Sequence, residues 1–289
     1  MRVALLHNAA AGDGLSPGDL RREIAEAGHE LIHEIGKGEE LRLPLEPSVD
    51  LIAVAGGDGT VRNAVHAVAG TGVALAILPL GTANNIAGAL GIEGALPDLI
   101  RAWERARRVP FDLGRMRGPW GGGRFLEGVG IGLVPEATAA AQQRGKENLG
   151  DSADEALDGA RRIYRETLAR LAPKALSLWA DGEKLDGEYL LVEVLNIPSV
   201  GPNLAFSPEA DPSDGLLDLV TAGETERDEL MALLERDGRT GPVTLPMRRV
   251  RNLEIGDGDA LHVDDQVRKG SEVGPVSIAI EPASVEFLV

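Results

Sequence analysis

The chain contains 289 residues, of which 43% are hydrophobic and 3% aromatic, and this length suits two domains of ordinary size with aliphatic cores. Its formal net charge of −17 argues against nucleic acid as a partner and against electrostatic docking on anionic lipid. Cysteine is absent, which excludes disulfides, thiolate catalysis and thiolate metal ligands. Because no apolar run approaches the length of a membrane span or of a signal peptide, we expect a cytoplasmic protein with at most peripheral membrane contact.

The first 110 residues alternate between apolar runs of strand character and segments with helical spacing. Strands are expected at residues 1–6, 30–35, 51–55 and 73–78. Helices are expected at residues 17–27, 61–68 and 97–108. Ser16 and Pro17 supply an N-cap and a first-turn proline for the first of these helices. Such alternation is typical of a parallel sheet with right-handed crossovers.

Two glycine loops follow the third and fourth expected strands, GGDGT at 56–60 and PLGTANN at 79–85. Parallel strands would bring both loops to the same edge of the sheet, which is where open α/β sheets bind ligands. Glycine allows a phosphate to approach unpaired backbone N–H groups. Asp58 adds a negative charge, which suits a phosphate site if a divalent cation or a proton lies between. The alternative is that both loops are ordinary turns of an α/β domain.

The character of the sequence changes at residues 109–114, after which short apolar runs are separated by Asp-Gly turns. One long segment, 135–171, has helical character with an acidic middle. Strands are expected at 124–134, 176–180, 189–197, 217–220, 250–255, 260–263, 276–280 and 285–289. This pattern favours a β-sandwich or a barrel-like second domain. We therefore assign residues 1–110 to an α/β domain, to which a last strand at about 283–289 returns, and residues 111–282 to a mainly β domain.

These motifs resemble the diacylglycerol kinase catalytic-domain family, which includes bacterial lipid kinases, sphingosine kinases and ceramide kinases. GGDGT and PLGTANN carry the resemblance, although GGDGT is shared with NAD kinases and, in looser form, with phosphofructokinases. Residues 8–12 look like a variant of the family's early nucleotide loop that lacks its proline. FDLG at 111–114 resembles the strand that opens the second domain, and 206–218 is similar to the family's Pro-x-Ala, Asp-Gly-x-x-Asp segment.

The resemblance implies a NAD kinase/diacylglycerol kinase-like α/β domain with a parallel sheet that binds nucleotide, and a β-sandwich-like domain that binds the acceptor. It implies ATP and Mg²⁺ and phosphorylation of a hydroxyl on a lipid or lipid-like alcohol such as diacylglycerol, in the cleft between the domains. The residues that would contact nucleotide are Asn8, Gly12, Gly56, Gly57, Gly59, Thr60, Arg62 and Thr82. Arg62 departs from the family pattern, and either a phosphate contact or a solvated helix position suits it.

Two groups of acidic residues would serve the metal. Asp58 and Asp112 would join a network of water and Mg²⁺ near the transferring phosphoryl group. Asp211, Asp214 and the carbonyl of Leu216 match a structural Mg²⁺ site seen in bacterial members, and an aspartate-rich turn is the alternative interpretation.

The largest departure concerns the general base, which in the family is the glutamate of an Asp-Gly-Glu turn. The matching stretch is Asp264-Asp265-Gln266, and an amide cannot accept the proton of the substrate. Losing a general base typically costs about 10²–10⁴-fold in rate, so we assign Asp265 as the substitute base and retain Gln266 as a candidate catalytic position. Two alternatives stay open, an NAD-kinase-like enzyme with a soluble acceptor and a nucleotide-binding protein with reduced catalysis. Unpaired sheet edges in the second domain leave a homodimer as a further alternative.

Overall fold

The computed structural model describes residues 1–8, 16–36, 39–145, 148–235, 244–256, 260–269 and 274–289. The chain divides into two compact units. Unit 1 contains residues 1–111 and 283–289, and unit 2 contains residues 112–282.

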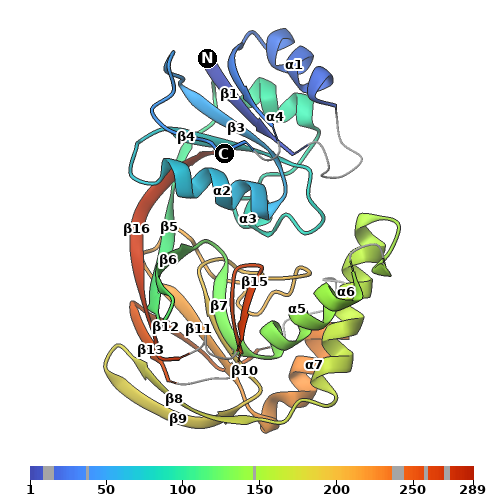
Figure 1. Ribbon diagram of the computed structural model, residues 1–289, viewed down its shortest axis with the longest axis vertical. Helices are drawn as coiled ribbons and strands as arrows, with labels where there is room; N and C mark the ends of the chain where they lie inside the picture. Colours follow the sequence, from blue (N-terminus) through green and yellow to red (C-terminus); the bar gives the residue numbers. More distant parts are fainter. Residues whose placement is uncertain (9–15, 37–38, 146–147, 236–243, 257–259, 270–273) are drawn as a thin grey trace. The chain divides into compact units, whose positions relative to one another are not determined.

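Unit 1 is built on a parallel sheet in the order β2-β1-β3-β4, which the carboxyl-terminal part of β16 extends beside β4. Its strands are β1 (Arg2–His7), β2 (Glu30–Ile35), β3 (Leu51–Gly56), β4 (Ala74–Pro79) and β16 (Val276–Leu288). His7 pairs with Ala55 and Gly56 pairs with Pro79, so β1, β3 and β4 end at the same edge (Figure 1). β3 is buried along its whole length, and its side chains contribute to a mainly aliphatic core.

The helices of unit 1 are α1 (Pro17–Glu26), α2 (Asp58–Val68), α3 (Asn85–Ala89) and α4 (Leu96–Ala102). Ser16 caps α1 in a capping box with Asp19, as its sequence predicts. The prediction that the last helix runs to residue 108 is wrong, because α4 ends at Ala102. The N–H of Arg107 instead donates to the carbonyl of Val289, and Arg108 begins strand β5.

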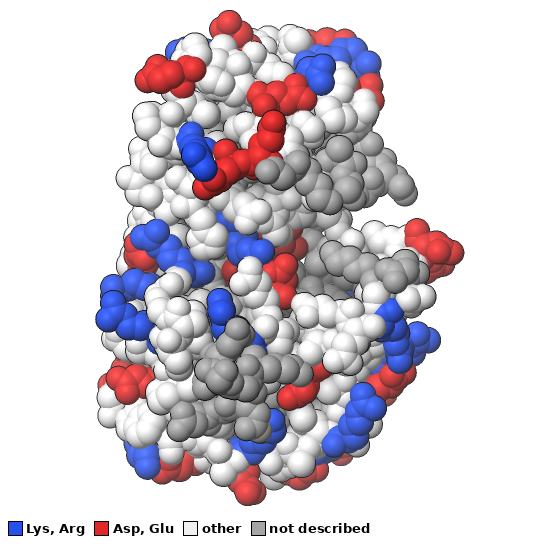
Figure 2. All heavy atoms as spheres, viewed as in Figure 1, with Lys and Arg blue, Asp and Glu red and all other residues white. Residues whose placement is uncertain are grey.

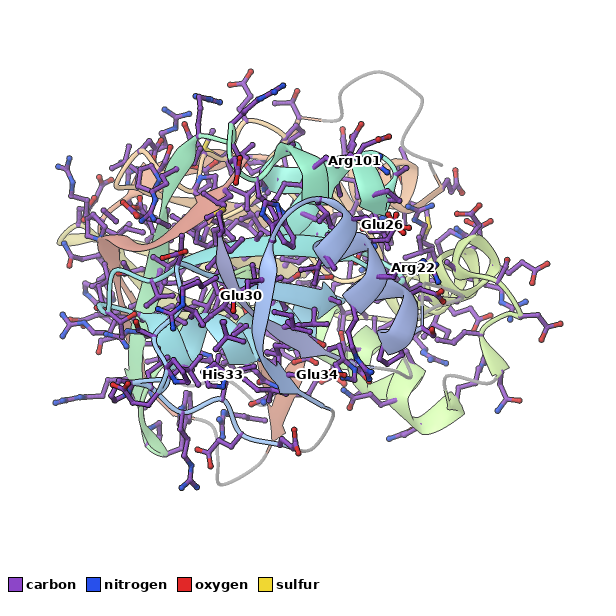
Figure 3. All side chains as sticks on the ribbon, turned by 90° about the horizontal axis from the view of Figure 1, so that it is seen from above. Arg22, Glu26, Glu30, His33, Glu34 and Arg101 are labelled. Atoms are coloured by element: carbon purple, nitrogen blue, oxygen red, sulfur yellow. The ribbon has the colours of Figure 1, made fainter. Side chains whose placement is uncertain are left out.

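Charged side chains are interspersed on the outer surface of unit 1. Figure 3 shows them on α1, β2 and α4: Arg22, Glu26, Glu30, His33, Glu34 and Arg101. Glu34 contacts Arg21 at 2.8 Å, and such exposed pairs contribute about 0–1 kcal/mol each. Figure 2 likewise shows acidic and basic side chains mixed over the face in view.

Unit 2 contains two sheets that enclose a common apolar core. The first has the order β12-β11-β10-β7-β14-β15, and the second contains β9, β8, β13 and β16, with β5 beside β16 and β6 beside β5. The strands of the first sheet are β7 (Gly128–Gly132), β10 (Leu191–Leu195), β11 (Leu217–Ala222), β12 (Met247–Val250), β14 (Ala260–Val263) and β15 (Gln266–Lys269). The others are β5 (Arg108–Gly118), β6 (Gly121–Phe125), β8 (Lys174–Ala180), β9 (Glu183–Tyr189) and β13 (Asn252–Ile255).

Helices cover the other face of the first sheet (Figure 1). They are α5 (Leu133–Arg144), α6 (Ala153–Leu168) and α7 (Arg227–Glu235), the last preceded by the 3₁₀ turn η2 (Glu224–Glu226). Successive side chains of β10 point to opposite faces of the first sheet. Val192 and Val194 enter the core between the two sheets, whereas Leu191 and Leu195 pack against the helices. Among the helices that the structure describes, none combines the length and the apolar character that a membrane crossing requires.

Several expected elements of unit 2 differ from the structure. The segment 135–171 contains two helices, because Ser152 starts α6 afresh with a capping box to Glu155. Residues 133 and 134, assigned to a strand, begin α5. The two strands expected at 276–280 and 285–289 form one strand, β16, which ends at Leu288. Helix α7 was not expected from the sequence. Strand β9 was not expected either, because it alternates exposed and half-buried residues and lacks an apolar run.

Candidate active site

The two glycine loops of unit 1 touch each other at Gly57 and Gly81. A Cβ atom on Gly81 would lie 2.4 Å from the Cα of Gly57, and one on Gly57 would lie 2.9 Å from the Cα of Gly81. Leu80 N–H also donates to the carbonyl of Gly56 at 3.0 Å. Asn84 closes the second loop, since its Oδ1 accepts from Gly81 N–H at 2.9 Å and its Nδ2 donates to the Gly81 carbonyl at 2.8 Å. The two motifs therefore form one continuous backbone surface.

Asp58 is the first residue of α2 and faces the start of α3. Its Oδ1 accepts a hydrogen bond from Ile86 N–H at 3.0 Å. Burial raises the pKa of the Asp58 carboxyl above its usual range, against the opposing effect of backbone N–H donors at residues 84–86. The Asp58 carboxyl therefore holds a proton more tightly than an exposed aspartate would.

The remaining nucleotide candidates follow the same strands. Asn8 comes directly after β1, and its N–H donates to the carbonyl of Ala55 at 3.0 Å. Thr60 packs so closely on Gly56 that a Cβ there would lie 2.5 Å from its Oγ1. Thr82 is exposed in the second loop, and Arg62 is half-buried on α2. The structure thus brings Asn8, the 56–60 loop and Thr82 to one sheet edge, whereas Gly12 lies outside the described residues.

Asp112 is held in unit 2 by the loop at 211–216. Its side chain is buried, its N–H donates to the Pro212 carbonyl at 2.6 Å, and its Oδ2 accepts from Gly215 N–H at 2.8 Å. The candidate catalytic aspartate and the candidate metal loop are therefore neighbours.

Asn196 was not singled out from the sequence, and it joins Asp112 to the rest of the unit 2 site. Its Nδ2 donates to the carbonyls of Asp112 and Leu126 at 2.9 and 3.0 Å. Its N–H donates to the Glu127 carbonyl at 2.9 Å. The only signal in the sequence is a polar residue directly after the buried strand β10, which does not identify a partner.

The turn at 264–265 joins β14 to β15. Asp264 has a positive φ of 50°, which suits a tight hairpin turn. Its Oδ1 accepts from the N–H groups of Leu126, Glu127 and Gly128 at 3.1, 2.9 and 3.4 Å. Asp264 therefore fixes the turn between β6 and β7 instead of facing solvent.

Asp265 and Gln266 are exposed on this turn. The Asp265 carbonyl accepts from Gln142 Nε2 on α5 at 3.3 Å. The structure places both candidate positions on the same hairpin and links that hairpin, through Asp264 and Leu126, to Asn196 and hence to Asp112.

The proposed metal ligands Asp211 and Asp214 each stabilise their own turn. Asp211 Oδ1 accepts from Ser213 N–H and Oγ at 2.9 and 2.7 Å, and Asp214 Oδ1 accepts from Leu216 N–H at 2.9 Å. Asp214 Oδ2 also lies 3.8 Å from Arg249. Within the described ranges no group of three or more His, Cys, Asp or Glu side chains is placed to hold a metal ion. The donors are all oxygen, which fits Mg²⁺ in kind, since that ion is commonly held by one or two carboxylates together with water.

Two buried side chains near this hairpin form a pair that the sequence does not predict. His262 and Glu193 are both fully buried, and His262 Nε2 lies 2.9 and 2.8 Å from the two carboxylate oxygens of Glu193. Glu193 lies within a buried apolar strand where nothing in the sequence marks it, and His262 gives no sign in the sequence that Glu193 is its partner.

Comparison with known proteins gives two family matches. Residues 2–116 match the diacylglycerol kinase catalytic domain, and residues 161–288 match the YegS C-terminal NAD kinase beta sandwich-like domain.

Relatives agree with these matches. A Mycobacterium tuberculosis protein named diacylglycerol kinase is 30% identical over 252 residues, which cover 80% of this chain and 76% of the relative. A Pseudomonas aeruginosa protein named probable lipid kinase YegS-like is 32% identical over 274 residues, which cover 91% and 85% of the two chains. A crystal structure of a diacylglycerol kinase from Bacillus anthracis has a TM-score of 0.73 at 22% identity and covers 99% of this chain and 96% of its own. Together they confirm the predicted fold class, an α/β domain followed by a β-sandwich-like domain.

Proposed function

This chain belongs to the diacylglycerol kinase family of lipid kinases, and we propose that it transfers the γ-phosphoryl group of ATP to a hydroxyl of a lipid or lipid-like alcohol such as diacylglycerol. The observation that carries this proposal is the contact of Gly57 with Gly81, which joins the two glycine loops into one surface with Asp58 beside it.

The nucleotide would lie on the edge of unit 1 formed by Asn8, the 56–60 loop and Thr82. Side chains are excluded where the two loops meet, so phosphate oxygens can approach backbone N–H groups. Each hydrogen bond to a charged group contributes about 1.5–3 kcal/mol. Three or four such bonds therefore suffice to hold a polyphosphate.

Asp58 and Asp112 would organise the metal and water around the transferring group. Mg²⁺, when bound, supplies positive charge to the phosphates during transfer. Asp58 carries a half-buried carboxyl whose pKa is raised by burial and which a bound cation would neutralise, and Asp112 is kept in place by Gly215 and Asn196. Asp211, Asp214 and the Leu216 carbonyl would hold a second, structural Mg²⁺, for which the oxygen donors are suitable.

Activation of the acceptor hydroxyl falls to the hairpin at 264–266. Gln266 cannot accept a proton, and Asp265, one residue earlier, is an exposed carboxylate on the same turn. We assign Asp265 as the base. Because phosphoryl transfer depends mainly on positioning and electrostatics, this exchange need not abolish the reaction.

The proposal is tested with labelled ATP and Mg²⁺ over mixed micelles of lipid alcohols, including diacylglycerol, with intact-mass detection of the products. We expect a phosphorylated lipid. A parallel reaction with NAD tests the soluble-acceptor alternative, and NADP as the sole product would overturn the lipid assignment.

The presence of Gln266 specifically favours a second candidate function, nucleotide binding with little turnover. It predicts ATP binding by calorimetry without phosphorylation of any alcohol in the panel. If the Gln266→Glu variant phosphorylates an alcohol, the fold still holds the rest of the catalytic machinery, and a purely regulatory role is excluded.

A further inference from the structure

A glycine on β7 makes room for the buried pair of Glu193 and His262. Gly130 is paired with Glu193 of β10 on one side and with His262 of β14 on the other. A Cβ on Gly130 would lie 2.0 Å from Glu193 Oε1. The two side chains therefore meet over Gly130, the central glycine of β7, on the sheet face that the helices cover.

The contacts of His262 define how many protons the pair holds. Its Nδ1 lies 2.9 Å from the carbonyl oxygen of Asp264, which can only accept, so Nδ1 carries a hydrogen. Its Nε2 faces both carboxylate oxygens of Glu193, so a second proton lies between the imidazole and the carboxylate. Burial opposes the charge on His262, but the Glu193 carboxylate and Asp264 together outweigh burial, and the pKa of His262 is raised. Burial raises the pKa of Glu193. Because both pKa values are raised, both side chains favour keeping the one proton that lies between them.

The Nδ1–H bond connects this pair to the turn that carries the base. The Asp264 carbonyl accepts from His262, while the Asp264 carboxylate accepts from residues 126–128. Asp264 is thus held on both sides, and Asp265 and Gln266 follow it directly.

We propose that Glu193 and His262 are positioning residues, whose shared proton keeps Nδ1–H on the Asp264 carbonyl and so fixes the hairpin that presents residues 265 and 266 to the acceptor hydroxyl. This inference rests on the proposed function of that hairpin. When the shared proton is lost, the remaining proton of His262 moves to Nε2, facing the stronger acceptor Glu193, and Nδ1 presents a lone pair to the Asp264 carbonyl. The turn then loses its anchor.

Other ionisable groups face the pair from neighbouring elements. Glu127 and Asp264 lie on the two adjoining turns, and Tyr164 projects from α6. Burial raises the pKa of Tyr164, and its hydroxyl is hydrogen-bonded with that of Thr138 at 2.9 Å, so it stays neutral. Because the pKa of His262 is raised in the folded state, the contribution of the pair is present at and below the ordinary histidine pKa and is lost as the pH rises through the raised value.

The decisive variant is Glu193→Met combined with His262→Leu, which replaces a buried ion pair with apolar side chains of similar size and tends to leave stability unchanged or increased. We expect a normal thermal unfolding midpoint, a fall in kcat of roughly 10- to 100-fold from misplacement of the turn, and an unchanged KM for ATP. We also expect faster hydrogen exchange at the amides of residues 126–128, which donate to Asp264. Unchanged kcat and unchanged exchange would overturn the proposal.

The matched control is Glu193→Gln, in which the amide donates to Nε2 and a neutral His262 keeps Nδ1–H on Asp264. We expect this variant to retain kcat near neutral pH and to lack the alkaline decline of the unaltered protein. In ¹⁵N-histidine spectra at pH 6.5, the ordinary histidine pKa, both ring nitrogens of His262 should be protonated in the unaltered protein, but only Nδ1 in the variant. An alkaline limb that is identical in both proteins would contradict the proposal. If the unaltered protein phosphorylates no lipid, the proposed function fails, while hydrogen exchange in the double variant still decides the positioning role.

Discussion

The carboxylate of Asp58 accepts a hydrogen bond from Ile86 N–H at 3.0 Å and thereby ties the first glycine loop to the helix that follows the second. One side chain therefore has two roles, the local structure of unit 1 and the proposed organisation of metal and phosphate. Substitutions that remove its charge, with or without its hydrogen bond, separate these roles.

Asp58→Asn should abolish phosphoryl transfer and leave stability close to that of the unaltered protein, because an amide oxygen still accepts from Ile86. Asp58→Ala should also abolish transfer and in addition lose about 1 kcal/mol of stability, as removal of a side-chain acceptor at a helix start typically does. Initial rates with labelled ATP and urea unfolding of both variants check this. If transfer persists in the asparagine variant, the assigned role is wrong.

Gly81→Ala should destabilise unit 1 by about 1–3 kcal/mol, since the new methyl group collides with the backbone of Gly57 and the loops must separate. The affinity for ATP should also fall in Gly81→Ala, because the separated loops no longer form one surface. The control is Gly88→Ala on α3, where nothing lies within 4 Å of the added Cβ and alanine favours the helix. Denaturant unfolding and calorimetric titration with ATP measure both effects. Equal ATP affinity in the two variants would argue against phosphate binding at the junction of the loops.

Gln266→Glu should raise kcat by supplying a second carboxylate at the hairpin, and Asp265→Asn should lower it by about 10²-fold or more, the usual effect of losing a general base. In the double variant Asp265→Asn/Gln266→Glu, activity should return through the new glutamate. Single-turnover rates at several pH values compare the three proteins. A kcat in Asp265→Asn equal to that of the unaltered chain would remove Asp265 from the mechanism.

Mg²⁺ should raise the thermal unfolding midpoint of the unaltered protein in the absence of nucleotide, because a structural ion at the 211–216 loop binds the folded state only. Asp211→Asn combined with Asp214→Asn should abolish this increase, and Asp186→Asn, an exposed carboxylate of β9, should not. Differential scanning calorimetry with and without the ion measures the shift. A shift of equal size in all three proteins would favour the aspartate-rich turn over a metal site.

Local patterns predicted the elements of unit 1 well, and the exception at residues 103–108 has a physical cause. The capping signals of Ser16 and Pro17 lie next to the helix that they start, so the sequence contains the whole interaction. Residues 103–108 continue a helical pattern, yet Arg107 pairs with Val289 from the other end of the chain. Pairing partners far along the chain are not visible to a local pattern.

The site shows the same division. Gly57, Asp58 and Gly81 could be selected because the loops require residues without a Cβ beside a carboxylate, and those requirements are written in the motif. Asn196 could not, since its partners Asp112 and Leu126 lie 84 and 70 residues away.

The amino-acid sequence alone determined the α/β and β-sandwich-like domains, the family and the positions of the glycine loops, because these follow from periodicity and from residues that only a tight turn tolerates. The tertiary structure decided that Gly57 touches Gly81, that Asp264 anchors the hairpin, and that the Glu193 carboxylate faces His262 Nε2 above Gly130. Each of these depends on the register between strands distant in sequence. That register is set by the packing of whole sheets, which no short segment contains.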